Sequence, residues 1–235
     1  MATILNLKQF FKPKPKPLTY KHRHFLNSLE EKKLEEILIY SEGEALASLM
    51  SPLQHKKVLF INDQKHKFAL KKLLQVEPSR VINLVYQGRE PQKQKQGYWT
   101  FQGELANLPL RKGFFDYYVC PFVLNSDMRW LEKAIQNFSE HMANGQKVLI
   151  SVRHPGLEQI LLNQNPATAV VSDLSLSKLF EILKQNHLYT EALHEGCVDL
   201  SLKPYFSEND HDYYHEYKNT PLCAVIAAVK FQRKN

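Results

Sequence analysis

His154 is the residue with the clearest chemical potential in this sequence. It follows the apolar run 147–152, which has the composition of a buried strand, and it precedes Pro155. In α/β proteins, ligands and reactive groups gather at the carboxyl ends of parallel strands. An imidazole at such a position can give or take a proton near neutral pH. We therefore predict that His154 is the catalytic residue, if the chain has one.

Two further histidines, His211 and His215, stand four residues apart in the segment HDYYHE. On a helix this spacing would put both imidazoles on one face, next to Glu216, as in a metal-binding pair. No third ligand accompanies them, and the sequence contains no nucleophile elbow, phosphate loop or paired cysteine motif. Three cysteines occur singly in apolar stretches, where buried free thiols are usual: Cys120, Cys197 and Cys223. We predict no metal site.

The elements that would position these residues alternate between helix and strand. Apolar runs predict strands over 57–61, 81–86, 98–101, 115–121, 147–152, 188–198 and 222–231. Helical spacing and capping residues predict helices over 29–42, 44–50, 64–76, 127–143 and 175–186, with Gly43 interrupting the first two. This alternation implies right-handed crossovers and a mostly parallel sheet with helices on both faces.

One stretch is more specific than the alternation. Residues 103–124 read GELANLPLRKGFFDYYVCPFVL, and a glycine turn at 143–147 leads into the next strand. Together with a closing strand, polar insert and final strand, this resembles the class I S-adenosylmethionine-dependent methyltransferases over residues 55–232. The resemblance implies a Rossmann-like fold whose sheet has seven strands. Its last strand would be antiparallel and inserted between two parallel strands.

The resemblance also implies where a cofactor would lie. Asn62 and Asp63 would form the turn after the first strand, and Glu104, beside Leu105, would accept a hydrogen bond from the adenine amine. Cys120 would end the fourth strand, where the substrate-facing loop of such enzymes begins. These residues are the predicted cofactor-binding set.

The turn after the first strand departs from the family pattern. A glycine-rich loop lets the backbone approach the cofactor, yet no glycine occurs between Gly43 and Gly88. Val85 stands where the family places an acid that accepts from the ribose hydroxyls, which would leave those hydroxyls unpaired at a cost of about 1–3 kcal/mol.

These departures favour a methyltransferase-like protein that lacks ordinary catalysis and acts as a binding or structural subunit, with no cofactor expected. One alternative is an active methyltransferase with an atypical cofactor loop, which would use S-adenosylmethionine. A small-molecule enzyme that reuses the crevice for other chemistry is a further alternative.

The positive charge of the chain is concentrated at its start. Residues 1–28 hold six basic residues and no acid, which leaves 25 basic and 24 acidic residues in the rest. We divide the chain into a basic Lys/Pro arm at 1–27 and an α/β domain at 28–235, with N-terminal helices at 28–54 and a core at 55–232. We predict that the arm can contact a protein. It is also the one segment of the chain for which we predict contact with a nucleic acid.

A Tyr-rich insert at 205–217 is the second predicted protein contact, as a surface or as a lid over the strand ends: Tyr205, Phe206, Tyr213, Tyr214 and Tyr217. The start of the chain lacks the apolar region of a secretory signal, and no run reaches the ~20 apolar residues of a membrane span. We therefore predict a cytoplasmic protein.

Removal of residues 1–17 is expected to leave the melting temperature nearly unchanged. The Lys-Pro alternation at 11–17 favours an extended segment that buries little surface. Thermal unfolding of the full and shortened chains, followed by circular dichroism, measures the difference. A drop of many degrees would show that the apolar residues at 4–11 belong to the core.

Overall fold

The computed structural model of the chain describes residues 31–62, 65–86, 94–95, 97–103, 111–123, 127–157, 175–208, 211–212 and 214–232. A sheet runs through it in the order β3-β4-β2-β1-β5-β6-β10-β7. Its strands are β1 (Lys57–Asn62), β2 (Arg80–Val85), β3 (Gln94–Lys95), β4 (Tyr98–Gln102), β5 (Tyr117–Cys120), β6 (Lys147–Arg153), β7 (Leu188–Cys197) and β10 (Pro221–Lys230). Within these residues, no helix is long and apolar enough to cross a bilayer.

The seven predicted strands are all present. The final strand, β10, pairs antiparallel with both β6 and β7 and lies between them, as predicted. Strands β4, β2, β1, β5 and β6 pair in parallel. The two-residue β3 pairs antiparallel with β4 and adds an eighth strand at that edge. The predicted Rossmann-like methyltransferase fold is therefore confirmed.

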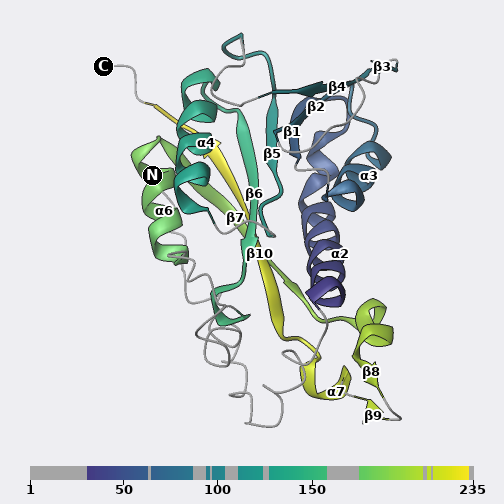
Figure 1. The fold of residues 1–235 in the computed structure, drawn as a ribbon. Coiled ribbons are helices and arrows are strands. Elements are labelled where there is room, and N and C mark those ends of the chain that lie inside the picture. Colours follow the sequence, from purple (N-terminus) through teal and green to yellow (C-terminus); the bar gives the residue numbers. More distant parts are fainter. Residues whose placement is uncertain are drawn as a thin grey trace.

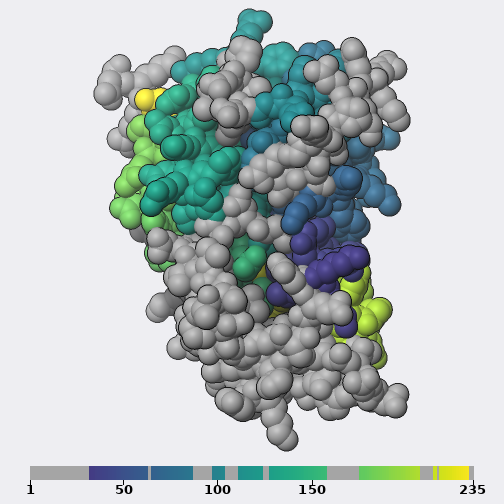
Figure 2. Space-filling model, viewed as in Figure 1, coloured from purple at the N-terminus to yellow at the C-terminus, as the bar shows by residue number. Residues whose placement is uncertain are grey.

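Helices cover both faces of the sheet, as Figure 1 shows. Helices α2 (Glu31–Met50) and α3 (Lys67–Gln75) lie on one side, and α4 (Met128–His141) and α6 (Leu176–Gln185) lie on the other. In the space-filling view of Figure 2, α4 is teal on the left, and α2 and α3 are purple and blue on the right. Strand β1 supplies both cores, because Val58 and Phe60 pack on the α2 side while Leu59 and Ile61 pack on the α4 side.

Side-chain caps start both helices of the second face, at Asp127 and Ser175. The Asp127 carboxylate accepts hydrogen bonds from the backbone N–H groups of Arg129 and Trp130, at 3.0 and 3.1 Å. The Ser175 hydroxyl accepts from the N–H of Lys178 at 3.1 Å. Each cap satisfies donors that the first helical turn leaves open, which explains why α4 and α6 begin where the sequence predicts.

The predicted interruption of the first helix at Gly43 is wrong. Helix α2 runs without a break through this residue to Met50. A glycine inside a helix costs about 0.5–1 kcal/mol relative to alanine, which a helix of this length tolerates. A Cβ atom at Gly43 would lie 2.3 Å from Cδ1 of Phe68 on α3. The glycine therefore serves the close approach of two helices and does not end one.

The Tyr-rich insert is built differently from the prediction. It comprises the 3-10 helix η4 (Leu200–Phe206), the hairpin strands β8 (Ser207–Glu208) and β9 (His211–Asp212), and the short helix α7 (Tyr214–Tyr217). The rings of Phe206 and Tyr217 are fully buried and lie 5.5 Å apart, so they belong to the core and not to a surface or a lid. His211 lies in β9 and His215 in α7, and therefore no single helix presents both imidazoles.

The amine of Lys230 ties β10 to the helices of the second face. The residue is only 5% exposed, and its Nζ donates to the Ser139 hydroxyl of α4 and, at 3.0 Å, to the carbonyl of Asn186 after α6. Burial lowers the pKa of this amine from its ordinary value of 10.5, and the nearby charge of Lys112 lowers it further.

The difference in stability between the wild type and Lys230→Met is expected to depend on pH, because Lys230 is buried. The folded chain releases the Lys230 proton at a lower pH than the unfolded chain, so the unfolded state binds more protons just below pH 10.5. The stability of the wild type relative to the variant should therefore rise with pH in that window. Urea unfolding at a series of pH values measures the difference.

Lys147→Met is the matched control for this experiment. A hydrogen bond to Glu191 raises the pKa of Lys147 above 10.5. The contribution of this lysine to the free energy of unfolding should therefore be constant below pH 10.5 and be lost above it. A difference between wild type and Lys230→Met that stays flat up to pH 10.5 would contradict the assignment.

Candidate functional site

The sheet changes its direction of winding between β1 and β5. Strand β1 leads through α3 on one face to β2, whereas β5 leads through α4 on the other face to β6. Because β1 and β5 are parallel neighbours, their carboxyl ends lie side by side. Crevices for ligands form at this point in open α/β sheets. The candidate site is therefore where the chain leaves Asn62 and Cys120.

Helix α2 places the acidic side chain of Glu42 at this switch point. Its buried face is apolar at Leu38, Ala45 and Leu46, but Glu42 occupies the same face between them and is 0% exposed. A charged side chain is almost never fully buried unless other groups compensate it. The position of Glu42 therefore requires a set of polar partners.

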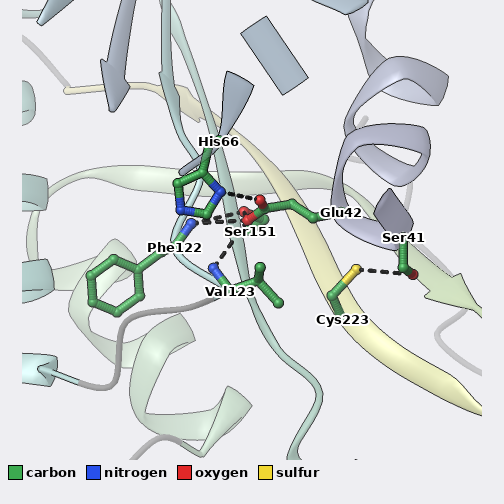
Figure 3. Close-up of polar contacts among 7 residues, drawn as sticks. All are labelled: Ser41, Glu42, His66, Phe122, Val123, Ser151 and Cys223. Carbon is green, nitrogen blue, oxygen red and sulfur yellow. Dashed lines mark hydrogen bonds and ion pairs between the residues drawn. The ribbon is translucent and has the colours of Figure 1, made fainter. Parts of the chain in front are cut away.

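Donors from three other parts of the chain surround the Glu42 carboxylate (Figure 3). Its Oε1 accepts from the backbone N–H groups of Phe122 at 3.1 Å and Val123 at 3.0 Å, directly after β5. The same oxygen accepts from the hydroxyl of Ser151 in β6. Its Oε2 lies 2.5 Å from Nδ1 of His66, the residue before α3. We call these five residues the Glu42 cluster.

The Glu42 cluster is closed to solvent, and both carboxylate oxygens of Glu42 have partners. His66 is 1% exposed, and the other members are 0% exposed. Several donors to one acid match the acceptor-only pattern of a carboxylate, and Nδ1 of His66 faces its second oxygen. Hydrogen bonds to a charged group contribute about 1.5–3 kcal/mol each, which offsets the cost of removing the carboxylate from water.

The order of the groups excludes a nucleophilic triad in this cluster. In such a triad the histidine stands between the hydroxyl and the acid and takes the proton of the hydroxyl. Here Glu42 stands between Ser151 and His66, because the hydroxyl and the imidazole each contact a different carboxylate oxygen. The arrangement binds a carboxylate and does not activate a nucleophile.

Close packing fixes α2 on both sides of Glu42. On one side, Gly43 lets the ring of Phe68 approach, and that ring stacks on Tyr40 at 4.9 Å. On the other side, Ser41 contacts the Sγ of Cys223 in β10 at 3.7 Å. A Cβ at Gly196 of β7 would lie 2.7 Å from Oγ of Ser41. The consecutive residues 41–43 therefore each meet a different part of the fold.

Cys223 is a buried free thiol, as predicted. Burial, together with the negative charge of Glu42, raises the pKa of this thiol from 9.0 to about 12. A thiol with such a pKa carries almost no thiolate at neutral pH, so it is chemically inert there.

The structure places some of the predicted cofactor residues in this region. Asn62 ends β1 and pairs with Val85 at the end of β2, and both are fully buried. Cys120 ends β5 and lies in the core on the α4 side. The other predicted members of the set fall outside the described residues: Asp63, Glu104 and Leu105. The binding role of the whole set stays a prediction.

His154 lies after β6, as predicted, but not in the Glu42 cluster. Its Nδ1 accepts from the N–H of Gly156 at 3.1 Å, and its Nε2 lies 3.4 Å from the Glu195 carboxylate on β7. These contacts fix the ring between its own turn and the edge of the sheet. The catalytic role of His154 stays a prediction.

The sequence analysis missed Glu42, His66 and Ser151. One signal was present, because Glu42 interrupts the apolar face of a helix four residues from Leu38 and from Leu46. A charged residue at such a position is an exception that asks for a buried partner. His66 and Ser151 carry no comparable signal, since a histidine after a strand and a serine within one are both common.

The comparisons with known proteins show the fold. No protein-family model and no curated protein sequence matches the chain. A solved S-adenosylmethionine-dependent methyltransferase from Mesorhizobium loti is similar with a TM-score of 0.59 and 13% identity, over 81% of this chain and 98% of that one. A Haloferax volcanii complex, between the Trm112 methyltransferase activator and a protein described as a methyltransferase, gives a TM-score of 0.62 and 10% identity over 85% and 92%.

A third similar structure is a geranyl diphosphate methyltransferase solved in complex with S-adenosylmethionine. It gives a TM-score of 0.55 and 12% identity over 88% of this chain and 94% of that one. At these identities the likeness concerns the fold alone. The chain therefore has the fold of S-adenosylmethionine-dependent methyltransferases.

At the switch point the described polar groups are engaged within the chain. The donors after β5 and in β6 contact Glu42, and the members of the cluster are closed to solvent, so in this arrangement these donors are not open to a cofactor. The side chain of Val85, at the end of β2, is apolar and buried.

Gly43→Ala is expected to destabilise the protein by about 1–2 kcal/mol. Helix propensity alone predicts a gain of about 0.5–1 kcal/mol, but the new methyl group would overlap the Phe68 ring, and overpacking costs about 1–3 kcal/mol. Urea unfolding measures the change. In the Phe68→Ala background, which removes the ring, the same substitution should be neutral or stabilising, and an equal loss in both backgrounds would contradict the packing argument.

Proposed function

We propose that this chain is a methyltransferase-fold protein without ordinary S-adenosylmethionine-dependent catalysis, which serves as a binding or structural subunit. The observation that carries the proposal is the Glu42 carboxylate, which engages the polar groups at the switch point from inside the chain. The absence of glycine between Gly43 and Gly88 supports the same conclusion independently. A cytoplasmic location is part of the proposal.

Protein contact is the role that we propose in place of catalysis. The arm at 1–27, ahead of the α/β domain at 28–235, is one proposed contact for a protein or a nucleic acid. The insert at 205–217 is the other, for a protein, through side chains other than the buried Phe206, Tyr214 and Tyr217. Beside the insert, Leu200 is 70% exposed, so this end of the molecule offers an apolar side chain to a partner. The Haloferax volcanii neighbour, whose structure is a complex with an activator protein, supports the idea that this fold accommodates such partners.

The alternative function is an active methyltransferase with an atypical cofactor loop. The fold favours it, because the geranyl diphosphate methyltransferase of similar structure is described in complex with S-adenosylmethionine. On this alternative the Glu42 cluster would have to open before the cofactor could enter. The two functions therefore differ in whether the native chain binds S-adenosylmethionine.

Calorimetric titration of the wild-type protein with S-adenosylmethionine is expected to show no micromolar binding. Each of the two lost features, the glycine loop and the ribose acceptor, would weaken binding by about 1.5–3 kcal/mol, which together amounts to a hundredfold or more. The combined substitutions Asn62→Gly, Gln64→Gly and Val85→Asp should raise the affinity for S-adenosylmethionine. The affinity should rise further when Glu42→Ala is added, because that substitution opens the cluster. Micromolar binding by the wild type would overturn the proposed function.

Glu104→Ala provides the matched control for this titration. If the natural chain does not bind the cofactor, the substitution changes nothing. If the chain is an active enzyme that uses Glu104 for the adenine amine, the same substitution weakens binding by roughly tenfold, the size of one hydrogen bond to a charged group.

A further inference from the structure

The groups that bind the Glu42 carboxylate all lie outside α2, the helix that carries Glu42. Two consecutive backbone N–H groups, those of Phe122 and Val123, converge on one oxygen after β5. The Ser151 hydroxyl reaches the same oxygen from β6, and the His66 imidazole faces the second oxygen from the start of α3. Helix α2 supplies only the carboxylate. Receptor and ligand therefore come from separate parts of the chain.

The four donors that surround Glu42 together suit a single carboxylate group. Paired N–H groups, a hydroxyl and an imidazole are hydrogen-bond donors that stabilise an anionic oxygen. Figure 3 shows these groups around the Glu42 carboxylate. Phe122 and Val123 follow β5, Ser151 lies in the second half of β6, and His66 directly precedes α3. Sheet position and donor chemistry thus agree, since this is where an open α/β sheet receives its ligands.

We propose that Phe122 N, Val123 N, Ser151 Oγ and His66 Nδ1 form a carboxylate-binding site, which the chain fills with its own Glu42 and which accepts a free small monocarboxylate once that side chain is removed. The inference rests on the proposed function in one respect, that the crevice is closed in the native chain. It adds the chemical class of ligand that the closed site recognises. It also identifies α2 as the element that must move before an external carboxylate can enter.

A tethered ligand explains why the native site would not respond to free carboxylates. Glu42 is held by the packing of residues 41 and 43 on both sides, so its effective concentration at the site is far above that of a dissolved acid. Removal of the side chain beyond Cβ takes away a group with the composition of acetate. The space that remains suits formate or acetate, and the closed, fully buried surroundings leave no room for a larger acid such as benzoate.

Chemical rescue of Glu42→Ala in the full chain tests the proposal. The variant should melt well below the wild type in chloride. About 100 mM sodium formate, roughly a hundredfold above a dissociation constant of about 1 mM, should raise its melting temperature by about 5–10 °C over chloride of equal ionic strength. Acetate should act similarly, and benzoate should not act.

Three matched proteins make the rescue specific. The wild type should not respond to formate, because Glu42 fills the site. Glu42→Gln should not respond either, since its amide occupies the same volume. Ser151→Ala in the Glu42→Ala background should require about tenfold more formate, because one donor to the anion is lost.

The proposal is overturned if formate and chloride act equally on Glu42→Ala, or if formate stabilises the wild type as much as the variant. Should Glu42→Ala not fold in chloride, refolding from urea in formate replaces the melting experiment: recovery in formate alone supports the site, and failure in both salts overturns it. No cofactor is present in these measurements. Failure of the rescue and failure of the proposed function are therefore separate results.

Discussion

A carboxylate that is removed from water needs donors on every side, and the Glu42 carboxylate imposes this requirement on α2, α3, β5 and β6 together. Phe122 and Val123 must present their N–H groups just where β5 ends, and Ser151 must stand opposite them in β6. His66 must close the remaining side, which fixes how the chain leaves β1. The buried polar groups at the switch point therefore depend on the position of one side chain.

The same requirement governs how α2 and α3 pack beside the switch point. A glycine-rich turn after the first strand keeps space for a ligand's phosphate or ribose groups, whereas this chain has its close-packing glycine in α2. Gly43 brings Phe68 and α3 against α2, and that approach carries His66 to Glu42. The contacts between α2 and α3 therefore set the position of the imidazole beside the strand ends.

Much of the fold could be predicted from the sequence because its signals are local. Asp127 and Ser175 cap helices through residues two or three positions away, and the apolar run before Asn62 is a strand by composition alone. The Glu42 cluster could not be predicted in this way, since Glu42 and Ser151 are separated by 109 positions. Gly43 was misread for the same reason, because its role depends on Phe68 in another helix and not on its neighbours in the chain.

Residues 41–43 also determine how α2 can change over evolutionary time. Successive residues of a helix point about 100° apart, so Ser41, Glu42 and Gly43 reach β10, the strand ends and α3 from one turn. Insertion or deletion of a single residue between this turn and the end of α2 at Met50 would rotate all of them away from their partners at once. Point substitutions there can be compensated one by one, but a change of length cannot. The distance from this turn to β1 should therefore be the most rigidly inherited length in the molecule.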